Sequence, residues 1–207
     1  MTPAEVEALF TRSDGSYLCA RWGRPIAPIV FGVEDATLQI LKGACEAVVA
    51  LAGHRMAETD PELGANLMVF FFRDWEELLA VPDLGRMIPD LDPLVERLVA
   101  QGANQYRVFR FEPDGAIKAA FVFLRMDAAL SQVPAEELAL AQMAQSILLW
   151  SDTAFASQSP LAIAGDRVIL RPDIAGVIAA AYDPSMPAVA QDPSHALRLF
   201  ARLSAAG

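Results

Sequence analysis

The sequence predicts an α+β fold (α/β in its succession of elements), with a mainly antiparallel sheet of about four strands covered by helices. Segments with strand character and segments with helical periodicity follow one another along the chain. Two strand-like segments flank a tight turn, which is typical of an antiparallel hairpin. Residues 136–150 predict a helix so apolar that it must lie at the centre of the fold, and a helical C-terminal part follows it.

Length and composition limit the size and class of the protein. The chain has 207 residues, which suits a single domain, 1–207, with a sizeable core. Although 54% of the residues are hydrophobic, no run of about 18 apolar residues occurs, so we expect no membrane span. A lobe boundary, if the chain has one, falls after residue 150 and separates an N-terminal lobe, 17–150, from a small C-terminal lobe, 151–207.

Charge and cysteine count restrict the partners and the compartment. The net charge is −10 and the basic residues occur singly, so nucleic acid and anionic membranes are poor partners. The N-terminus lacks a basic segment followed by an apolar one, so we expect no signal peptide and a cytoplasmic location. Cys19 and Cys45 are too few for a disulfide framework and are expected to be core thiols.

The first part of the chain predicts a helix, two strands and a longer helix. Residues 3–10 have a short helical pattern, and residues 17–20 and 29–31 have strand character. Residues 36–52 carry apolar side chains at helical spacing, and Gly53 is placed to end that helix in the left-handed conformation. We therefore expect a strand–helix unit at the start of the sheet.

The middle of the chain predicts a central strand, two helices and the hairpin. Residues 67–72 are apolar on both faces, as in a buried strand. A capping box starts a short helix at 75–80, and a proline and a glycine bracket a second helix at 93–101. Strands at 104–111 and 117–125 then flank the turn of the hairpin. Apolar residues on both faces of the second strand indicate that the sheet is covered twice.

The last part of the chain begins with the central helix, 136–150. A small-residue loop follows it, and then a brief strand at 168–170. A helix that ends at Tyr182 and a last helix that starts near Ser194 complete the chain.

Known catalytic and cofactor motifs are missing from the sequence. The two histidines, His54 and His195, lie far apart and neither has metal-ligand spacing. No nucleophile elbow and no phosphate-binding glycine motif occurs. Paired carboxylates stand at helix starts, where capping and the helix dipole explain them. We therefore predict no catalytic residue, no metal site and no cofactor.

A polar group on and after the central helix is the one candidate site. Gln142 and Gln145 share a narrow face of that helix, and Ser151 and Asp152 follow its end. Such residues either form the solvated edge of the helix or line a cleft that binds a peptide or a small ligand. We take these four as candidate ligand- or partner-binding residues.

The order of elements resembles the N-terminal lobe of zincin metalloproteases, in which a buried helix carries His-Glu-x-x-His under an edge strand. Residues 141–152 (AQMAQSILLWSD) and 170–187 are similar to an uncharacterised bacterial zincin-like family with a Glu-Glu-x-x-Gln helix. The resemblance places the metal and catalytic positions at Ala141, Gln142 and Gln145. None of these side chains is a usual zinc ligand, and neither glutamine can act as a general base.

Three functional hypotheses follow. The first is a non-catalytic zincin-like protein, a pseudoenzyme whose cleft beside Gln142 and Gln145 binds a protein or peptide partner or a small ligand. The second is a metal-independent hydrolase that uses Asp152 with Arg125 or Asp60 as acid and base. The third is a structural homo-oligomer, which the high apolar content suggests.

Overall fold

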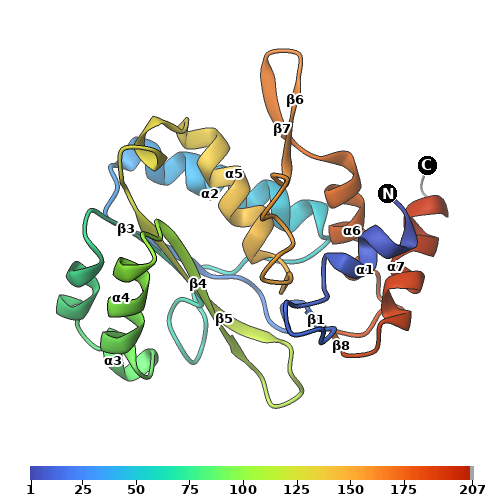
Figure 1. The fold of residues 1–207 in the computed structure, drawn as a ribbon, viewed down its shortest axis with the longest axis horizontal. Helices are drawn as coiled ribbons and strands as arrows, with labels where there is room; N and C mark the ends of the chain where they lie inside the picture. Colours follow the sequence, from blue (N-terminus) through green and yellow to red (C-terminus); the bar gives the residue numbers. More distant parts are fainter. Residues whose placement is uncertain (206–207) are drawn as a thin grey trace.

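A four-stranded mixed sheet forms the centre of the computed structural model, which describes residues 1–205 (Figure 1). Side by side, its strands are β2 (Pro28–Phe31), β3 (Leu67–Phe72), β5 (Ile117–Arg125) and β4 (Gln105–Phe111). β2, β3 and β5 run parallel, and the edge strand β4 is antiparallel to β5. Helices and strands together confirm the α+β class, and the main sheet has the expected four strands.

The expectation of a mainly antiparallel sheet is wrong, because in the main sheet β4 and β5 pair antiparallel whereas β2–β3 and β3–β5 pair parallel. β2 and β3 are joined through α2 (Asp35–Leu51), and a helical crossover connects parallel strands. β3 is followed by η1 (Trp75–Ala80), α3 (Leu84–Met87) and α4 (Leu91–Ala100) before β4 begins. β5 then inserts between β4 and β3 and runs parallel to β3.

The remaining elements surround this sheet. They are α1 (Pro3–Ala8), β1 (Cys19–Ala20), η2 (Leu130–Gln132), α5 (Ala135–Ser146), β6 (Leu161–Ala164), β7 (Arg167–Leu170), α6 (Pro172–Ala181), β8 (Val189–Ala190) and α7 (Ser194–Ala205). β1 pairs with β8, and β6 pairs with β7. The segment 161–164, expected to be loop, is a strand because β7 pairs with it across a turn at Gly165. Within 1–205, no helix is long and apolar enough to cross a membrane.

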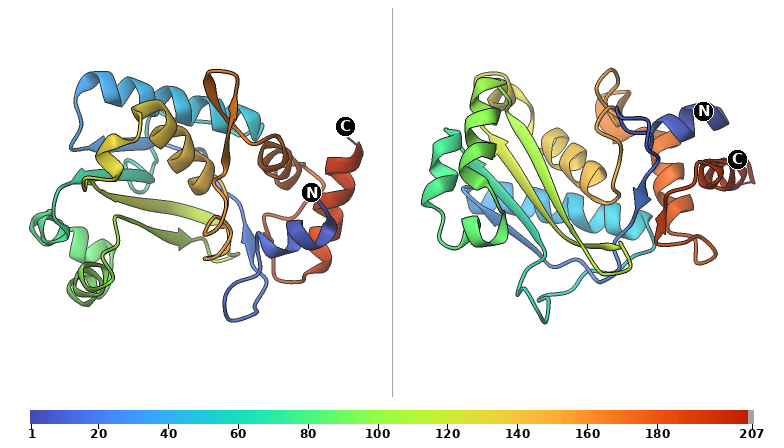
Figure 2. Two further views of the ribbon diagram at one scale, coloured as in Figure 1. Left: turned by 45° about the horizontal axis from the view of Figure 1, so that its top comes forward. Right: turned by 60° about the horizontal axis from the view of Figure 1, so that its bottom comes forward.

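Helices cover both faces of the sheet (Figure 2). On one face, Val122 and Leu124 of β5 belong to the same hydrophobic cluster as residues of α2 and α5. On the other face, Phe121 and Phe123 pack with Trp75 and with residues of α3 and α4. The predicted double coverage is therefore confirmed, and it places α5 on one side of β5 and the short helices on the other.

α5 is the predicted central helix, but it ends at Ser146 and does not reach Trp150. Beyond it the chain pairs with the N-terminal segment: Leu148 forms a bridge with Arg21, and the Leu149 N–H donates to the carbonyl of Ala20 at 2.9 Å. The helical periodicity continues through these residues, but the backbone hydrogen bonds to a distant segment hold them extended. This extended segment forms one wall of the candidate site.

The C-terminal part packs against the N-terminal segment. One hydrophobic cluster contains Val6 of α1, Ile174 of α6 and Leu199 of α7, together with residues of the sheet. The Tyr182 hydroxyl donates to the carbonyl of Ile147 at 2.8 Å. Residues on both sides of position 150 thus share one core. The β6–β7 hairpin projects away from the rest of the chain in Figure 1.

Candidate functional site

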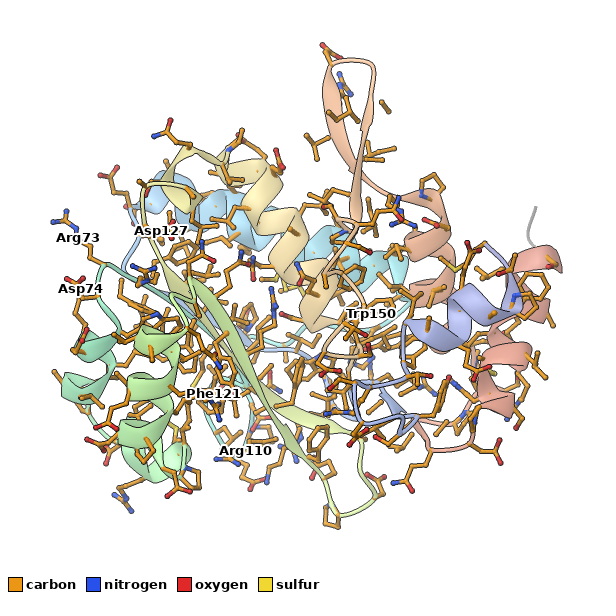
Figure 3. The ribbon with its side chains drawn as sticks, viewed as in Figure 1. Arg73, Asp74, Arg110, Phe121, Asp127 and Trp150 are labelled. Carbon is orange, nitrogen blue, oxygen red and sulfur yellow. The ribbon has the colours of Figure 1, made fainter. Side chains whose placement is uncertain are left out.

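A cleft of about 620 Å³ lies between the edge strand β4 and the segment that follows α5. We call it the β4 cleft. Its walls come from β4, from the end of α5 with residues 149–156, and from Arg12 of the N-terminal segment. Trp150 lies just beyond the end of α5 in Figure 3. The side chains that line the cleft include those of Gln105, Arg107, Phe109, Gln145, Leu149, Trp150, Asp152 and Phe155.

The backbone of β4 offers unpaired hydrogen-bonding groups to this cleft. The Arg125 N–H donates to the carbonyl of Asn104 at 2.8 Å, and the two strands then continue in antiparallel register. Hydrogen-bonded and non-hydrogen-bonded pairs alternate in such a ladder. The N–H and C=O groups of Gln105, Arg107 and Phe109 therefore point away from β5, towards the open edge. These three residues also line the cleft.

Gln142 lies beneath the cleft and does not line it. Its side chain is only 1% exposed. Its Oε1 accepts a hydrogen bond from the Arg107 guanidinium, and its Nε2 donates to Oε1 of Gln105 at 2.7 Å. The buried amide thus connects α5 to β4 and orients two side chains that do line the cleft.

Arg107 is the functional candidate that sequence reasoning missed. Its Nε is buried and has no hydrogen-bond partner among residues 1–205, and no carboxylate in that part of the chain forms an ion pair with it. Burial lowers its pKa to about 10, so it stays cationic at neutral pH. The available signal was its position: Gln105, Arg107 and Phe109 are every second residue of β4, so their side chains share the face of the sheet that α5 covers.

The other three predicted residues have different roles. Gln145 lines the cleft, and its side-chain amide forms no hydrogen bond within the described part of the chain. Ser151 is buried: its N–H donates to the carbonyl of Leu9 at 2.8 Å, and its hydroxyl pairs with that of Thr153 at 2.9 Å. The role of Ser151 is therefore structural. Asp152 lines the cleft but is already engaged.

Asp152 holds the turn around Ser13. The Ser13 N–H donates to Asp152 Oδ1 at 2.9 Å, and the Ser13 hydroxyl donates to Oδ2. These hydrogen bonds keep the pKa of Asp152 below its usual range. A carboxylate that is stabilised as the anion in this way is a poor general acid.

The acid–base group considered from the sequence is not assembled. Arg125 pairs with Asp127 at 3.4 Å, and Asp60 pairs with Arg24 at 3.1 Å. Neither Arg125 nor Asp60 lines the β4 cleft. Figure 3 shows Asp127 well apart from Trp150, which is close to Asp152 in the chain. Asp152, Arg125 and Asp60 therefore do not act together.

The two histidines occupy separate structural positions. His54 Nε2 lies 2.8 Å from the carbonyl of Arg24, and His195 Nδ1 lies 2.8 Å from the hydroxyl of Tyr17. In residues 1–205, no three His, Cys, Asp or Glu side chains gather where they could hold a metal ion. Cys19 and Cys45 are buried, as expected of core thiols.

A second cavity, of about 570 Å³, lies between β2 and α2. Its floor is apolar and includes Leu41 and Met143. At its rim Lys42 pairs with Glu46 at 3.9 Å. It contains none of the four polar residues predicted from the sequence, so the β4 cleft is the stronger candidate.

Comparison with protein-family models, with curated proteins and with solved structures finds no match for this chain.

Proposed function

We propose that this protein is a non-catalytic binding protein with a zincin-like fold, and that it holds an extended peptide segment of a partner in the β4 cleft. The observation that carries this proposal is the open edge of β4 inside a lined cleft. An extended peptide that adds a strand to a sheet edge gains backbone hydrogen bonds, while the surrounding side chains provide specificity.

The lining of the cleft suits such a ligand. Phe109, Leu149 and Phe155 supply apolar contact surface, and the Gln145 amide is free to pair with a peptide group. The outward backbone groups of β4 would hold the ligand as a strand, and successive side chains of a strand point to opposite faces of the sheet. Every second ligand side chain would then face α5.

Three features support a non-catalytic role. Asp152 is engaged by Ser13, and the Ser151 hydroxyl is bound to Thr153 instead of a base. A serine nucleophile requires an adjacent base, whereas the partner of the Ser151 hydroxyl is the hydroxyl of Thr153. Gln142, the residue that the resemblance places at the catalytic position, binds Arg107 and Gln105.

The zincin-like relationship is part of the same proposal. A buried helix next to an edge strand is what the resemblance implies, and the Arg107–Gln142 contact connects α5 to β4 in that way. A cytoplasmic location, a bacterial origin and a regulatory role belong to this proposal too.

A peptide-display selection with random heptapeptides tests the proposal. We expect the selected peptides, made synthetically, to slow hydrogen exchange of the Arg107 and Phe109 amides. Phe109→Pro removes an outward-pointing donor without breaking the β4–β5 ladder, and proline is tolerated at such edge positions. Phe109→Ala is the matched control, since it removes the ring but keeps the N–H.

We expect binding to be weakened more by Phe109→Pro than by Phe109→Ala, with both variants folded as judged by thermal unfolding. Equal effects of the two variants would contradict strand addition. Hydrogen exchange of the β4 amides that stays the same when a selected peptide is added would also contradict it. Cleavage of a bound peptide by the purified protein would contradict the non-catalytic role.

A further inference from the structure

We infer that Arg107 determines the specificity of the β4 cleft by binding a carboxylate group of the ligand. This inference rests on the proposed function and adds the chemical class of the ligand. It starts from the environment of the guanidinium, whose Nε is buried without a hydrogen-bond partner within residues 1–205.

An unpaired charge that is partly removed from water is costly unless hydrogen bonds or an opposite charge compensate it. The guanidinium of Arg107 has one protein acceptor, Gln142 Oε1, which is neutral. Its Nε is buried without a partner, and its Nη1 has no acceptor within residues 1–205. The protein therefore leaves most of this charge uncompensated, next to an open cleft.

The nearby carboxylate of Asp152 does not compensate Arg107, although both line the same cleft. Both oxygens of Asp152 accept hydrogen bonds from Ser13. That arrangement holds Asp152 on the wall formed by the N-terminal turn. An anionic ligand group can thus reach Arg107 without displacing a protein carboxylate.

The charge balance favours a single negative charge on the ligand. The charged side chains that line the cleft are Arg12, Arg107 and Asp152, which leaves one positive charge in excess. A carboxylate carries one negative charge and matches the planar fork of a guanidinium. A phosphate group carries up to two, and the rest of this protein is strongly acidic. The balance therefore selects a carboxylate over a phosphate.

Gln142 and Gln105 act as positioning residues in this scheme. Gln142 fixes the guanidinium from below, and its Nε2 fixes Gln105 beside it. A side chain held in one rotamer loses less entropy on binding than a free one. Gln142→Leu should therefore weaken carboxylate binding while Arg107 and its charge remain in place.

The first experiment uses sodium acetate as the probe and needs no peptide. We expect acetate to shift the NMR signals of the Arg107 guanidinium saturably in the millimolar range. Sodium chloride and acetamide at equal concentrations should not do so. Gln142→Leu should weaken this response, and Arg86→Gln, which changes an exposed residue of α3 outside the cleft, should preserve it. Signals of Arg107 that acetate leaves unmoved would overturn the inference, whatever the outcome with peptides.

The second experiment identifies the source of the carboxylate with selected peptides. One series replaces each Asp or Glu by Asn or Gln, and the other amidates the C-terminus. For binding to the wild type, we expect the changes in one series to lower the affinity by about tenfold or more, because an ion pair is lost. For binding to Arg107→Gln, the same changes should lower the affinity by less than about twofold.

Peptides that still need Phe109 N–H but tolerate both replacements would leave strand addition standing and overturn the carboxylate specificity. Acetate binding at Arg107 without any peptide binding would support the carboxylate specificity of Arg107 and contradict strand addition. The two proposals can therefore fail separately.

Discussion

The hydroxyl of Tyr17 and Nδ1 of His195 lie 2.8 Å apart in the protein interior, where they join the N-terminal segment to the first turn of α7. The rings are also in edge contact, with centroids 6.0 Å apart. Because the elements they connect lie at opposite ends of the sequence, this pair contributes to the closure of the whole fold.

The first prediction concerns this pair and pH. Burial, helped by Arg198 and Arg202, lowers the pKa of His195 from 6.5 to about 4. Between about pH 6.5 and pH 4, the unfolded chain therefore binds a proton at this imidazole that the folded chain does not bind. Stability from the neutral imidazole is fully present above pH 6.5 and is lost as the pH falls towards 4, by about 3 kcal/mol.

This effect is measured by denaturant unfolding of the wild type and of His195→Gln between pH 7.5 and pH 4. Glutamine can still accept a hydrogen bond from Tyr17 but does not titrate. We expect the free energy of unfolding of the wild type to fall more steeply than that of the variant. Parallel curves would show that the pKa of His195 does not differ between the folded and unfolded states.

The second prediction concerns Gly32, directly after β2. Its φ is +82°, and a Cβ at this position would lie 2.0 Å from the carbonyl oxygen of Phe71. Gly32→Ala should therefore lower the free energy of unfolding by at least about 3 kcal/mol, since the backbone clash adds to the left-handed strain.

Gly64→Ala is the matched control. Gly64 has a φ of +74°, but a Cβ added there would meet no atom within 4 Å. Only the strain of about 1 kcal/mol should remain. Equal losses for the two variants, measured by denaturant unfolding, would mean that the approach of Gly32 to Phe71 is unimportant.

The third prediction concerns the two thiols. Burial raises the pKa of Cys19 and of Cys45 to about 12, so almost no thiolate is present at neutral pH. We expect neither to react with a disulfide reagent in the native protein, and both to react once denaturant unfolds the chain. A thiol that reacts well before global unfolding would reveal local opening around that residue.

The fourth prediction uses tryptophan fluorescence to report on the cleft. Trp150 stacks on Phe10 with centroids 5.2 Å apart and meets the edge of Phe155 at the same centroid distance. A peptide in the β4 cleft should change its emission. Trp150→Phe should abolish that change, and Trp75→Phe, on the opposite face of the sheet, should keep it. The reverse result would place the ligand elsewhere.

The strands and short helices that could be predicted well have strong local signals. β3 and β5 have the predicted bounds, because each is a segment rich in apolar residues that turn or loop residues flank. η1 also begins after the expected capping box at Asp74, which Figure 3 labels. In each case neighbouring residues decide the conformation.

The parts that could not be predicted depend on contacts between distant segments. The end of α5 is set by pairing of residues 148 and 149 with the N-terminal segment. The parallel pairing of β3 with β5 depends on where β5 inserts. The buried environment of Arg107 includes Gln142, which lies 35 positions further along the chain. The hydrophobic periodicity of a segment carries no information about such long-range contacts.

The open edge of β4 has one more consequence, for self-association. An exposed sheet edge can pair with the edge of another sheet and so promote aggregation. Here residues 149–156 and the N-terminal turn stand along that edge as walls of the cleft. A single extended chain can enter between them, whereas a second sheet would meet the walls first. The walls of the β4 cleft therefore also hinder pairing of β4 with the edge of a second sheet.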